Sequence, residues 1–450
     1  MTPAPTTTPS DASTKPALKP TAILHRTPWR PPVATAAEGM YVWLEDGRKV
    51  LDAVGGAAVE KVSYVYNMQL SNEPAEELAR VLIASSKGAF ELCGFVSGGS
   101  EAMEGVMKLA RQYYYETGQP QRSNFIGRKL SFHGNTLGTL SLAYHPTRRA
   151  PYAAILDDRN FHHVSPAYAK RFQKPGETEE QYVERLRQEL EDKFLELGSD
   201  TVIGFVAETV VRDHRRRGAT QGLFQAMNKF VMVHFGFASQ LDRQDWALYM
   251  HGRHSGRGHP DIQAVAKGLG GGYASIGAIL MSKKVADGVR DSAGFWKHGH
   301  TYQAHPLACA ASLAVQKVIV DEKLLENVNV QGPYLESLLR ARLQAPNALA
   351  APFTFDIRGR GAWWGIEFDF TGPEAARLDF KGTQFAIAVQ ARCLQNGLIV
   401  MGLTSGANLE GTRGDHCMLS PAYNVTKEQV EAIVDIFVAS VEEILKEAAV

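Results

Sequence analysis

The chain has 450 residues, of which 44% are hydrophobic, and its 48 basic side chains balance its 48 acidic ones. This content suffices for two or three domains with sizeable cores, and a zero net charge argues against a dedicated nucleic-acid binder, which normally carries a basic excess. No apolar run reaches the roughly 20 residues that a membrane helix needs.

Residues 1–22 consist mainly of Pro, Thr, Ala and Ser, a composition that cannot bury a core, so we expect a disordered lead-in. A transit peptide is normally rich in arginine, whereas the first arginine here is Arg26. We therefore expect a cytoplasmic protein. The cysteines contain no Cys-x-x-Cys pair, which favours neither a zinc site nor a disulfide framework and is typical of a reducing compartment; they are Cys93, Cys309, Cys393 and Cys417.

The first predicted element is a hairpin over residues 41–53, with alternating strands around an Asp46-Gly47 turn. From about Lys61 to Met281, helical patterns alternate with short apolar strands, which favours an α/β layer with a mostly parallel sheet. The clearest helices cover residues 101–114 and 179–197. The clearest strands cover residues 201–207, 262–266 and 276–281.

Helix-rich sequence follows Pro306, and a strand is expected around residues 363–370. The last helix begins at Thr426-x-x-Gln429, a capping-box pattern, and carries one apolar face; its residues are Val430, Ile433, Val434, Phe437, Val441 and Ile444. We place an N-terminal segment at residues 23–60 that packs with a small domain, a large domain at residues 61–310, and the C-terminal small domain at residues 311–450.

The first glycine-rich site is Phe95-Val-Ser-Gly-Gly-Ser-Glu-Ala102, a short strand that leads into an amphipathic helix. Small residues let a ligand approach the backbone closely, and the unpaired amides of a first helical turn attract an anion such as phosphate. A tight turn without a ligand would have the same pattern, so this motif alone leaves both interpretations open.

The second glycine-rich site spans residues 260–273 and includes Lys267-Gly-Leu-Gly-Gly-Gly272 at the end of an apolar strand. A lysine that emerges from an apolar strand is expected to be partly desolvated, which lowers its pKa and makes the amine a nucleophile toward carbonyl groups. The alternative is a surface lysine at a strand end.

Together these motifs resemble the class III aminotransferases, the ω-aminotransferase branch of the fold type I pyridoxal-phosphate enzymes. The resemblance extends from about Ile23 to the C-terminus. It implies an α/β fold with a large cofactor-binding domain around a mostly parallel central sheet and a smaller α+β domain. The matching motifs are Ser97-Gly-Gly-Ser-Glu-Ala102, Ser131-Phe-His-Gly-Asn-Thr136, Val206-Ala-Glu208, Ala266-Lys-Gly-Leu-Gly-Gly-Gly272 and His300-Thr-Tyr302.

The resemblance implies that Lys267 holds pyridoxal 5'-phosphate as a Schiff base and then moves the proton between substrate and cofactor. Gly99 and Ser100 would receive the phosphate group. Phe132 would stack on the pyridine ring, and His133 would lie near the ring edge, although either could also be an ordinary core residue.

Three further positions take roles from the resemblance. Thr301 would reach the phosphate of the neighbouring subunit, which implies a homodimer with shared active sites. Glu208 would lie near the cofactor, although Thr209 follows it where the family usually has proline. Arg358 and Arg413 are candidates for binding a substrate carboxylate, and a solvated loop is an equal alternative for each.

The family pattern breaks between Val211 and Pro260. The family has there a strand that ends in Asp-Glu-Val, whose aspartate keeps the pyridine nitrogen protonated. This interval lacks an Asp-Glu pair, and it holds eight basic residues against three acidic ones and five of the 14 histidines. A metal site at His251, His254 and His259 lacks an acidic or cysteine partner, and a nucleic-acid patch at residues 212–217 lacks interleaved aromatic residues.

A shifted reading frame or mispredicted exon over residues 212–259 explains this interval better. The codons of residues 246–252 can be read in a shifted frame that starts at the third base of the tryptophan codon. This frame permits Gly-Thr-Leu-His-Ala-Trp, which is typical of the family. The codons of residues 215–224, read in a frame shifted by one base, permit another sequence that is typical of the family. Sequencing the transcript tests this hypothesis. A second departure lies near residues 59–63, where the family has a further helix.

The resemblance implies transfer of an amino group from an amine or amino acid to a keto acid or aldehyde. The expected partners are therefore small molecules, with no nucleic acid, membrane or metal. Two alternatives stay open. Aminomutases and isomerases of the family use the same residues without a second keto substrate, and the missing aspartate is typical of an inactive pseudoenzyme.

Overall fold

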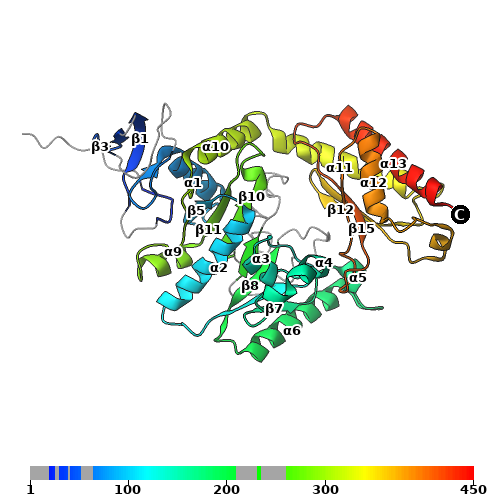
Figure 1. Ribbon diagram of the computed structural model, residues 1–450, viewed down its shortest axis with the longest axis horizontal. Coiled ribbons are helices and arrows are strands. Elements are labelled where there is room, and N and C mark those ends of the chain that lie inside the picture. Colours follow the sequence, from blue (N-terminus) through cyan, green and yellow to red (C-terminus); the bar gives the residue numbers. More distant parts are fainter. Residues whose placement is uncertain (1–19, 26–29, 39–40, 52–63, 209–230, 235–259) are drawn as a thin grey trace, which may run out of the picture.

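The computed structural model describes residues 20–25, 30–38, 41–51, 64–208, 231–234 and 260–450. Its centre is a seven-stranded sheet in the order β5-β11-β10-β9-β8-β6-β7 (Figure 1). The strands are β5 (Leu92–Val96), β6 (Asn124–Arg128), β7 (Phe161–Val164), β8 (Val202–Glu208), β9 (Val231–His234), β10 (Ile262–Ala266) and β11 (Gly277–Met281).

This sheet is mostly parallel, as the sequence predicts. Strand β11 runs antiparallel to β10 and to β5, and the other ladders of the sheet are parallel. The expected strands at residues 201–207, 262–266 and 276–281 correspond to β8, β10 and β11. Strand β9, between β8 and β10, was not among the expected strands.

Helices cover both faces of this sheet. Helices α2 (Gly99–Glu116) and α9 (Lys283–Arg290) share one core cluster with residues of β10 and β11, and α1 (Glu73–Ser85) and α10 (Pro306–Asp321) share a second. Each of the strands β5, β10 and β11 has five residues, and all of them are buried because both faces of each strand are covered. Other helices here are α3 (Leu137–Leu142), α4 (Pro146–Arg149), α5 (Ala169–Phe172) and α6 (Glu179–Leu197), with 3₁₀ turns at Ala150–Ile155 and Lys267–Leu269.

The N-terminal strands form a second sheet in the order β3-β2-β1-β4. They are β1 (Val33–Glu38), β2 (Tyr41–Leu44), β3 (Lys49–Leu51) and β4 (Ser71–Asn72). The β2–β3 pair confirms the predicted hairpin, with Gly47 at φ 86° in its turn.

The described part of the N-terminal segment packs on the large domain. Strand β1 pairs with β4, which leads into α1, and Ile23 forms a bridge to Cys93 on β5. In Figure 1, β1 and β3 lie at the opposite end of the molecule from α13. The expectation that residues 23–60 pack with the small domain is therefore wrong for these residues, because their backbone partners belong to β4 and β5.

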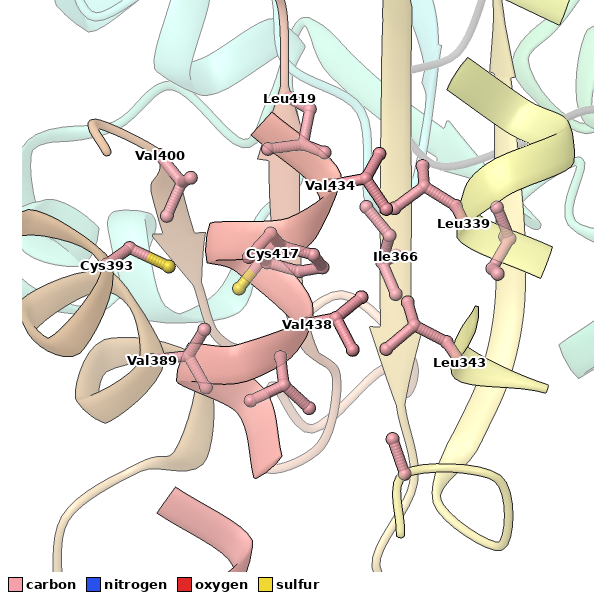
Figure 2. Close-up of a cluster of buried hydrophobic side chains, with 14 of the residues drawn as sticks. Leu339, Leu343, Ile366, Val389, Cys393, Val400, Cys417, Leu419, Val434 and Val438 are labelled. Atoms are coloured by element: carbon pink, nitrogen blue, oxygen red, sulfur yellow. The ribbon is translucent and has the colours of Figure 1, made fainter. Parts of the chain in front are cut away.

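The C-terminal domain is an antiparallel sheet in the order β12-β13-β15-β14, covered by helices. Its elements are α11 (Leu324–Leu343), β12 (Thr354–Arg360), β13 (Trp363–Phe368), a 3₁₀ turn at Pro373–Arg377, α12 (Phe385–Gln395), β14 (Met401–Leu403), β15 (Asp415–Leu419) and α13 (Lys427–Ala448). Figure 2 shows how its core forms: Leu339 and Leu343 of α11, Ile366 of β13 and Val434 and Val438 of α13 point toward one another.

The long helices begin where their capping residues predict. The expected helix at residues 179–197 is α6, and both α6 and α13 have complete capping boxes. In α13 the Gln429 amide donates to Thr426 Oγ1 at 3.3 Å, and the Thr426 amide donates to Gln429 Oε1 at 2.9 Å.

Thr426→Ala should lower the free energy of unfolding by about 1 kcal/mol, because the Gln429 amide in the first turn of α13 loses its acceptor. Chemical denaturation measures the change. Thr383→Ala, at an exposed position before α12, is the matched control and should change stability by less than about 0.5 kcal/mol. Equal effects in the two variants would show that the cap contributes nothing.

Within the described residues, no helix combines the length and apolar character needed to cross a membrane. Cys93, Cys309, Cys393 and Cys417 are buried and form no disulfide bond.

Candidate active site

The predicted site residues follow strands that run in one direction. Strands β5, β6, β8 and β10 are mutually parallel, and their carboxyl ends lead to Ser100, Phe132, Glu208 and Lys267 respectively. In an open α/β sheet this edge is where ligands bind. The topology therefore brings residues that lie up to 167 positions apart in the sequence (Ser100 and Lys267) to the same edge of the sheet.

The first part of the site is the start of α2. Its N-cap, Gly98, has an extended backbone and no side chain that could cap the helix. The amides of the first turn are consequently available to an anion, and the dipole of an 18-residue helix favours negative charge there. Ser100 Oγ donates to Asn135 Oδ1 at 2.8 Å and accepts from the Asn135 amide at 3.1 Å. This pair ties α2 to the loop that carries Phe132 and His133.

Close backbone contacts place the start of α2 beside the end of β10. A Cβ atom on Gly99 would lie 3.3 Å from Ala266 Cβ, and one on Gly277 would lie 2.5 Å from the Gly98 carbonyl oxygen. The second approach tolerates no side chain, which explains the glycine at the start of β11. Gly134 has a φ of 145°, and a Cβ there would lie 2.8 Å from Ser100 Oγ.

Lys267 is the first residue after β10. Its φ of 56° is left-handed, an uncommon conformation for a lysine, and it begins the 3₁₀ turn Lys267–Leu269. Its side chain is exposed. The expected partial desolvation is therefore wrong for the chain in this structure, because the buried strand ends at Ala266 and the turn carries Lys267 out of the core.

The loop after β6 carries the aromatic residue and the histidine. Phe132 is half-buried, and the guanidinium of Arg148 on α4 lies over its ring, 4.7 Å from the centroid. His133 is completely buried. Phe132 is therefore partly covered by Arg148, and His133 lies inside the core.

Glu208 ends β8 and is 7% exposed. Its backbone carbonyl accepts a hydrogen bond from Arg128 Nη2 at 2.9 Å, and its carboxylate opposes the burial that lowers the pKa of Arg128. In the sheet register Glu208 lies beside His234, the last residue of β9. Phe235 follows in the sequence, so β9 does not end in an aspartate.

Thr301 lies in an exposed turn before α10. The turn is held to neighbouring elements, because Asn67 Nδ2 donates to the His300 carbonyl at 3.2 Å and His300 Nε2 lies 3.7 Å from Glu101 Oε2 on α2. A pocket of about 520 Å³ lies beside it, and its lining includes Ser97, Tyr273, Tyr302 and Leu307.

Arg358 does not bind a substrate carboxylate, contrary to one of the two expectations for it. The residue is 4% exposed, and its Nη1 lies 2.6 Å from Oε2 of Glu367, which is 2% exposed. Tyr168 donates to the same oxygen at 2.7 Å, and Arg171 binds the other carboxylate oxygen of Glu367 at 2.6 Å. The solvated-loop alternative is also wrong, since Arg358 lies in β12. The Arg358 guanidinium binds Glu367 at the place where α5 of the large domain meets β12 and β13.

Arg413 is exposed on the segment 404–414 between β14 and β15. This segment contacts α4: Thr147 and Ser405 hydroxyls lie 3.1 Å apart, and a Cβ on Gly411 would lie 3.0 Å from Pro146. Arg413 therefore remains compatible with both interpretations that the sequence allowed.

The sequence reasoning missed two residues of this region. Asn135 stood inside a quoted motif, and its pairing with Ser100 depends on a tertiary contact between α2 and the β6 loop. The contact of Arg148 with Phe132 could not be predicted, because nothing in the sequence places α4 beside Phe132.

Several expectations lie outside the described residues. These are the lead-in up to residue 19, the interval 209–259 except for β9, the histidines His251, His254 and His259, and the departure near residues 59–63. Within the described residues, no group of three or more His, Cys, Asp or Glu side chains is arranged to hold a metal ion.

Comparison with known proteins gives consistent matches. Residues 56–231 and 248–441 match the class-III aminotransferase family. The match stops after residue 231 and resumes at residue 248, so the expected break from Val211 to Pro260 was drawn too wide.

An uncharacterized aminotransferase of Schizosaccharomyces pombe is 36% identical to this chain, over 97% of each protein. A γ-aminobutyrate transaminase of Solanum lycopersicum is 29% identical, over 92% of this chain and 81% of its own length. The solved structure of an ω-transaminase from Pseudomonas jessenii in complex with PMP shares the fold, with a TM-score of 0.73 and 24% identity over 93% of this chain and 94% of that one.

Proposed function

Because this chain belongs to the class-III aminotransferases, we propose that it binds pyridoxal 5'-phosphate at the carboxyl edge of its central sheet. There it would move an amino group between an amine or amino acid and a keto acid or aldehyde, with Lys267 as the residue that holds the cofactor. The observation that carries the proposal is the meeting of the α2 N-terminus, the Phe132 loop and the end of β10 at one edge.

The residues at this edge fit the phosphate end of such a cofactor. The uncapped first turn of α2 offers amides at Gly99 and Ser100, and the glycine backbone leaves room for close approach. Phe132 is half-buried and offers an aromatic surface for a flat ring. When bound, pyridoxal phosphate supplies a carbonyl carbon for amine exchange and a conjugated ring that accepts electrons.

The protein's own part of the reaction falls mainly on Lys267. Its amine is exposed at the sheet edge, so a substrate can reach it, and the left-handed turn fixes the direction in which the side chain leaves β10. An unprotonated lysine amine there can take a proton from one carbon and return it to another, the general acid–base role.

The test is the near-visible absorbance of the purified 450-residue chain with pyridoxal phosphate, before and after an amine is added. We expect a band that bleaches with amine and recovers with a keto acid. Turnover of an amino acid without any keto acid would instead favour the aminomutase or isomerase.

One observation favours the pseudoenzyme as a second candidate. Strand β9 ends at His234 beside Glu208 and is followed by Phe235, where the resemblance calls for an aspartate. Without that carboxylate the ring nitrogen is less readily protonated and the ring accepts electrons less well. A band that forms but does not bleach with any amine would support this candidate.

We further propose a homodimer in which Thr301 contacts the phosphate bound by the neighbouring subunit. Thr301 is exposed, and large apolar side chains around the adjacent pocket are exposed as well: Tyr273 at 85%, Leu307 at 65% and Tyr302 at 59%. An exposed apolar cluster of this kind is typical of a protein interface.

Thr301→Ala should weaken cofactor binding about tenfold, since a hydrogen bond to a charged group contributes roughly 1.5–3 kcal/mol. Fluorescence titration with pyridoxal phosphate measures the affinity, and light scattering measures the mass. Thr383→Ala is the control for an exposed threonine. A monomeric mass, or unchanged affinity in Thr301→Ala, would contradict the shared site.

A further inference from the structure

The segment 295–300, which leads into the Thr301 turn, is attached along the side of α2. Gln112 on this helix makes two of the attachments. Its Nε2 donates to the Phe295 carbonyl at 2.8 Å, and its Oε1 accepts from the Lys297 amide at 2.8 Å. One side chain therefore binds a backbone donor and a backbone acceptor of the segment.

Three further side-chain pairs join the segment to α2, and they occur in reverse order along the two elements. The pairs are Glu116–Lys297 at 2.7 Å, Lys108–His298 at 2.9 Å and Glu101–His300 at 3.7 Å. The α2 members of these pairs and Gln112 are separated by seven or four residues, a spacing that places them on one face of a helix. The segment therefore runs along this face toward the N-terminus of α2, and Thr301 follows its last contact.

Trp296 fixes the beginning of the segment between α2 and the central sheet. It is completely buried, and its amide donates to the His25 carbonyl at 3.0 Å. A Cβ atom on Gly94 of β5 would lie 2.7 Å from the indole ring, and one on Gly105 of α2 would lie 3.4 Å from it. These two glycines leave room for the indole, so the beginning of the segment has a fixed place on the large domain.

The length of the segment matches the distance that it has to cover. From Gln112 to Glu101 there are 11 helical residues, which span about 17 Å at 1.5 Å per residue. The five steps from Phe295 to His300 reach roughly 17 Å when the chain is extended. A segment with so little slack transmits a shift at its beginning to the turn at its end.

We propose that this face of α2 sets the position of the Thr301 turn, with Gln112 as the positioning residue that fixes the register of segment 295–300. Gln112 lies 12 residues from Ser100, about 18 Å along the helix, so it acts on the cofactor site only through Thr301. This inference rests on the proposed function, because it assumes that Thr301 contacts the phosphate bound by the neighbouring subunit. Helix α2 would then serve two sites, one at its N-terminus and one through its side.

The first test is the affinity of Gln112→Ala for pyridoxal phosphate, measured by fluorescence titration. We expect a Kd about three- to tenfold higher than that of wild type, the size of one lost hydrogen bond, with an unchanged dimer mass by light scattering. Alanine is the strongest helix former, so the variant keeps α2. Gln188→Ala is the matched control, because Gln188 on α6 binds Asp192 of its own helix at 2.8 Å, and its Kd should equal that of wild type.

A double variant distinguishes positioning from a general loss of structure. Gln112→Ala combined with Thr301→Ala should bind pyridoxal phosphate as weakly as Thr301→Ala alone, because a residue that acts through the Thr301 hydroxyl has no effect once that hydroxyl is removed. Losses that multiply in the double variant would overturn the inference. Gln112→Glu keeps the acceptor for the Lys297 amide and should recover part of the affinity.

Hydrogen exchange of the cofactor-free protein gives a readout that needs no ligand. In Gln112→Ala the amides of residues 299–303 should exchange about three- to tenfold faster than in wild type, although Gln112 contacts only residues that precede them. Gln188→Ala should leave this exchange unchanged. Exchange at 299–303 that stays at the wild-type rate in Gln112→Ala would overturn the inference.

The inference and the proposed function fail in different ways. If wild type binds no pyridoxal phosphate, the proposed function fails, and the exchange at residues 299–303 still decides for or against the role of Gln112. If wild type binds the cofactor and Gln112→Ala binds it equally well, the proposed function stands and the inference is overturned. If Thr301→Ala leaves the affinity unchanged, the inference fails together with the shared site.

Discussion

Replacement of Lys267 by alanine is expected to remove the absorbance band that depends on the lysine amine, leaving the absorbance of pyridoxal phosphate itself, and to lower amino transfer by at least about 10²–10⁴-fold. The lower bound is the usual contribution of a positioned proton-transfer group, and loss of the covalent attachment adds to it. The change removes the side chain beyond Cβ and leaves the backbone in place, because the turn after β10 sets the backbone of Lys267. Absorbance with pyridoxal phosphate and single-turnover bleaching measure the two effects.

A matched control is available for the backbone. Lys381 is an exposed lysine whose φ of 50° is close to the 56° of Lys267, so Lys381→Ala makes the same chemical change at the same kind of turn. It should leave both the band and the rate unchanged. A band of wild-type intensity in Lys267→Ala would show that another amine holds the cofactor, and the assignment of this residue would be wrong.

Glu367→Ala should destabilise the protein by about 3–5 kcal/mol, the usual result of removing one member of a buried ion pair. Glu367 lies on β13 and is 2% exposed, and its two oxygens bind Arg358 and Arg171 at 2.6 Å each. Burial raises the pKa of Tyr168, so its hydroxyl stays protonated and donates to the same carboxylate. Removal of Glu367 would leave two guanidinium groups without this shared partner.

Thermal and chemical denaturation measure the loss, and Arg187→Ala is the control for an exposed pair. Arg187 bridges Glu184 and Glu191 on the surface of α6, where such pairs contribute at most about 1 kcal/mol. If Glu367→Ala and Arg187→Ala cost the same, the network between α5 and the β12–β13 pair would not join the domains energetically.

Lys267 and Glu367 differ in burial. Lys267 is exposed, whereas Glu367 is buried and its carboxylate binds Arg358 and Arg171. The sequence did not indicate the role of Glu367, because its partners Arg358 and Arg171 lie on other elements.

The local elements could be predicted from the sequence because their signals are local. The capping residues Thr178 and Thr426 lie three positions from their glutamines, and the apolar stripe of α13 repeats within two turns. The short apolar runs of β8, β10 and β11 were visible for the same reason, since a strand covered on both faces is apolar throughout. Lys267 and Ser100 could be named because each stands in a glycine motif directly after a strand.

The tertiary structure decided the rest, because those facts depend on which distant segments meet. Arg358 is neutralised by Glu367 only because β12 and β13 are paired and α5 packs beside them. The N-terminal strands join the large domain through β4, and β9 enters the sheet although its sequence lies in an unusual interval. The contact between Arg148 and Phe132 exists only because α4 packs beside the loop after β6. The spacing of residues along the chain indicates which of them share a helix face or a strand. The partner of a charged side chain depends instead on how elements far apart in the sequence pack together.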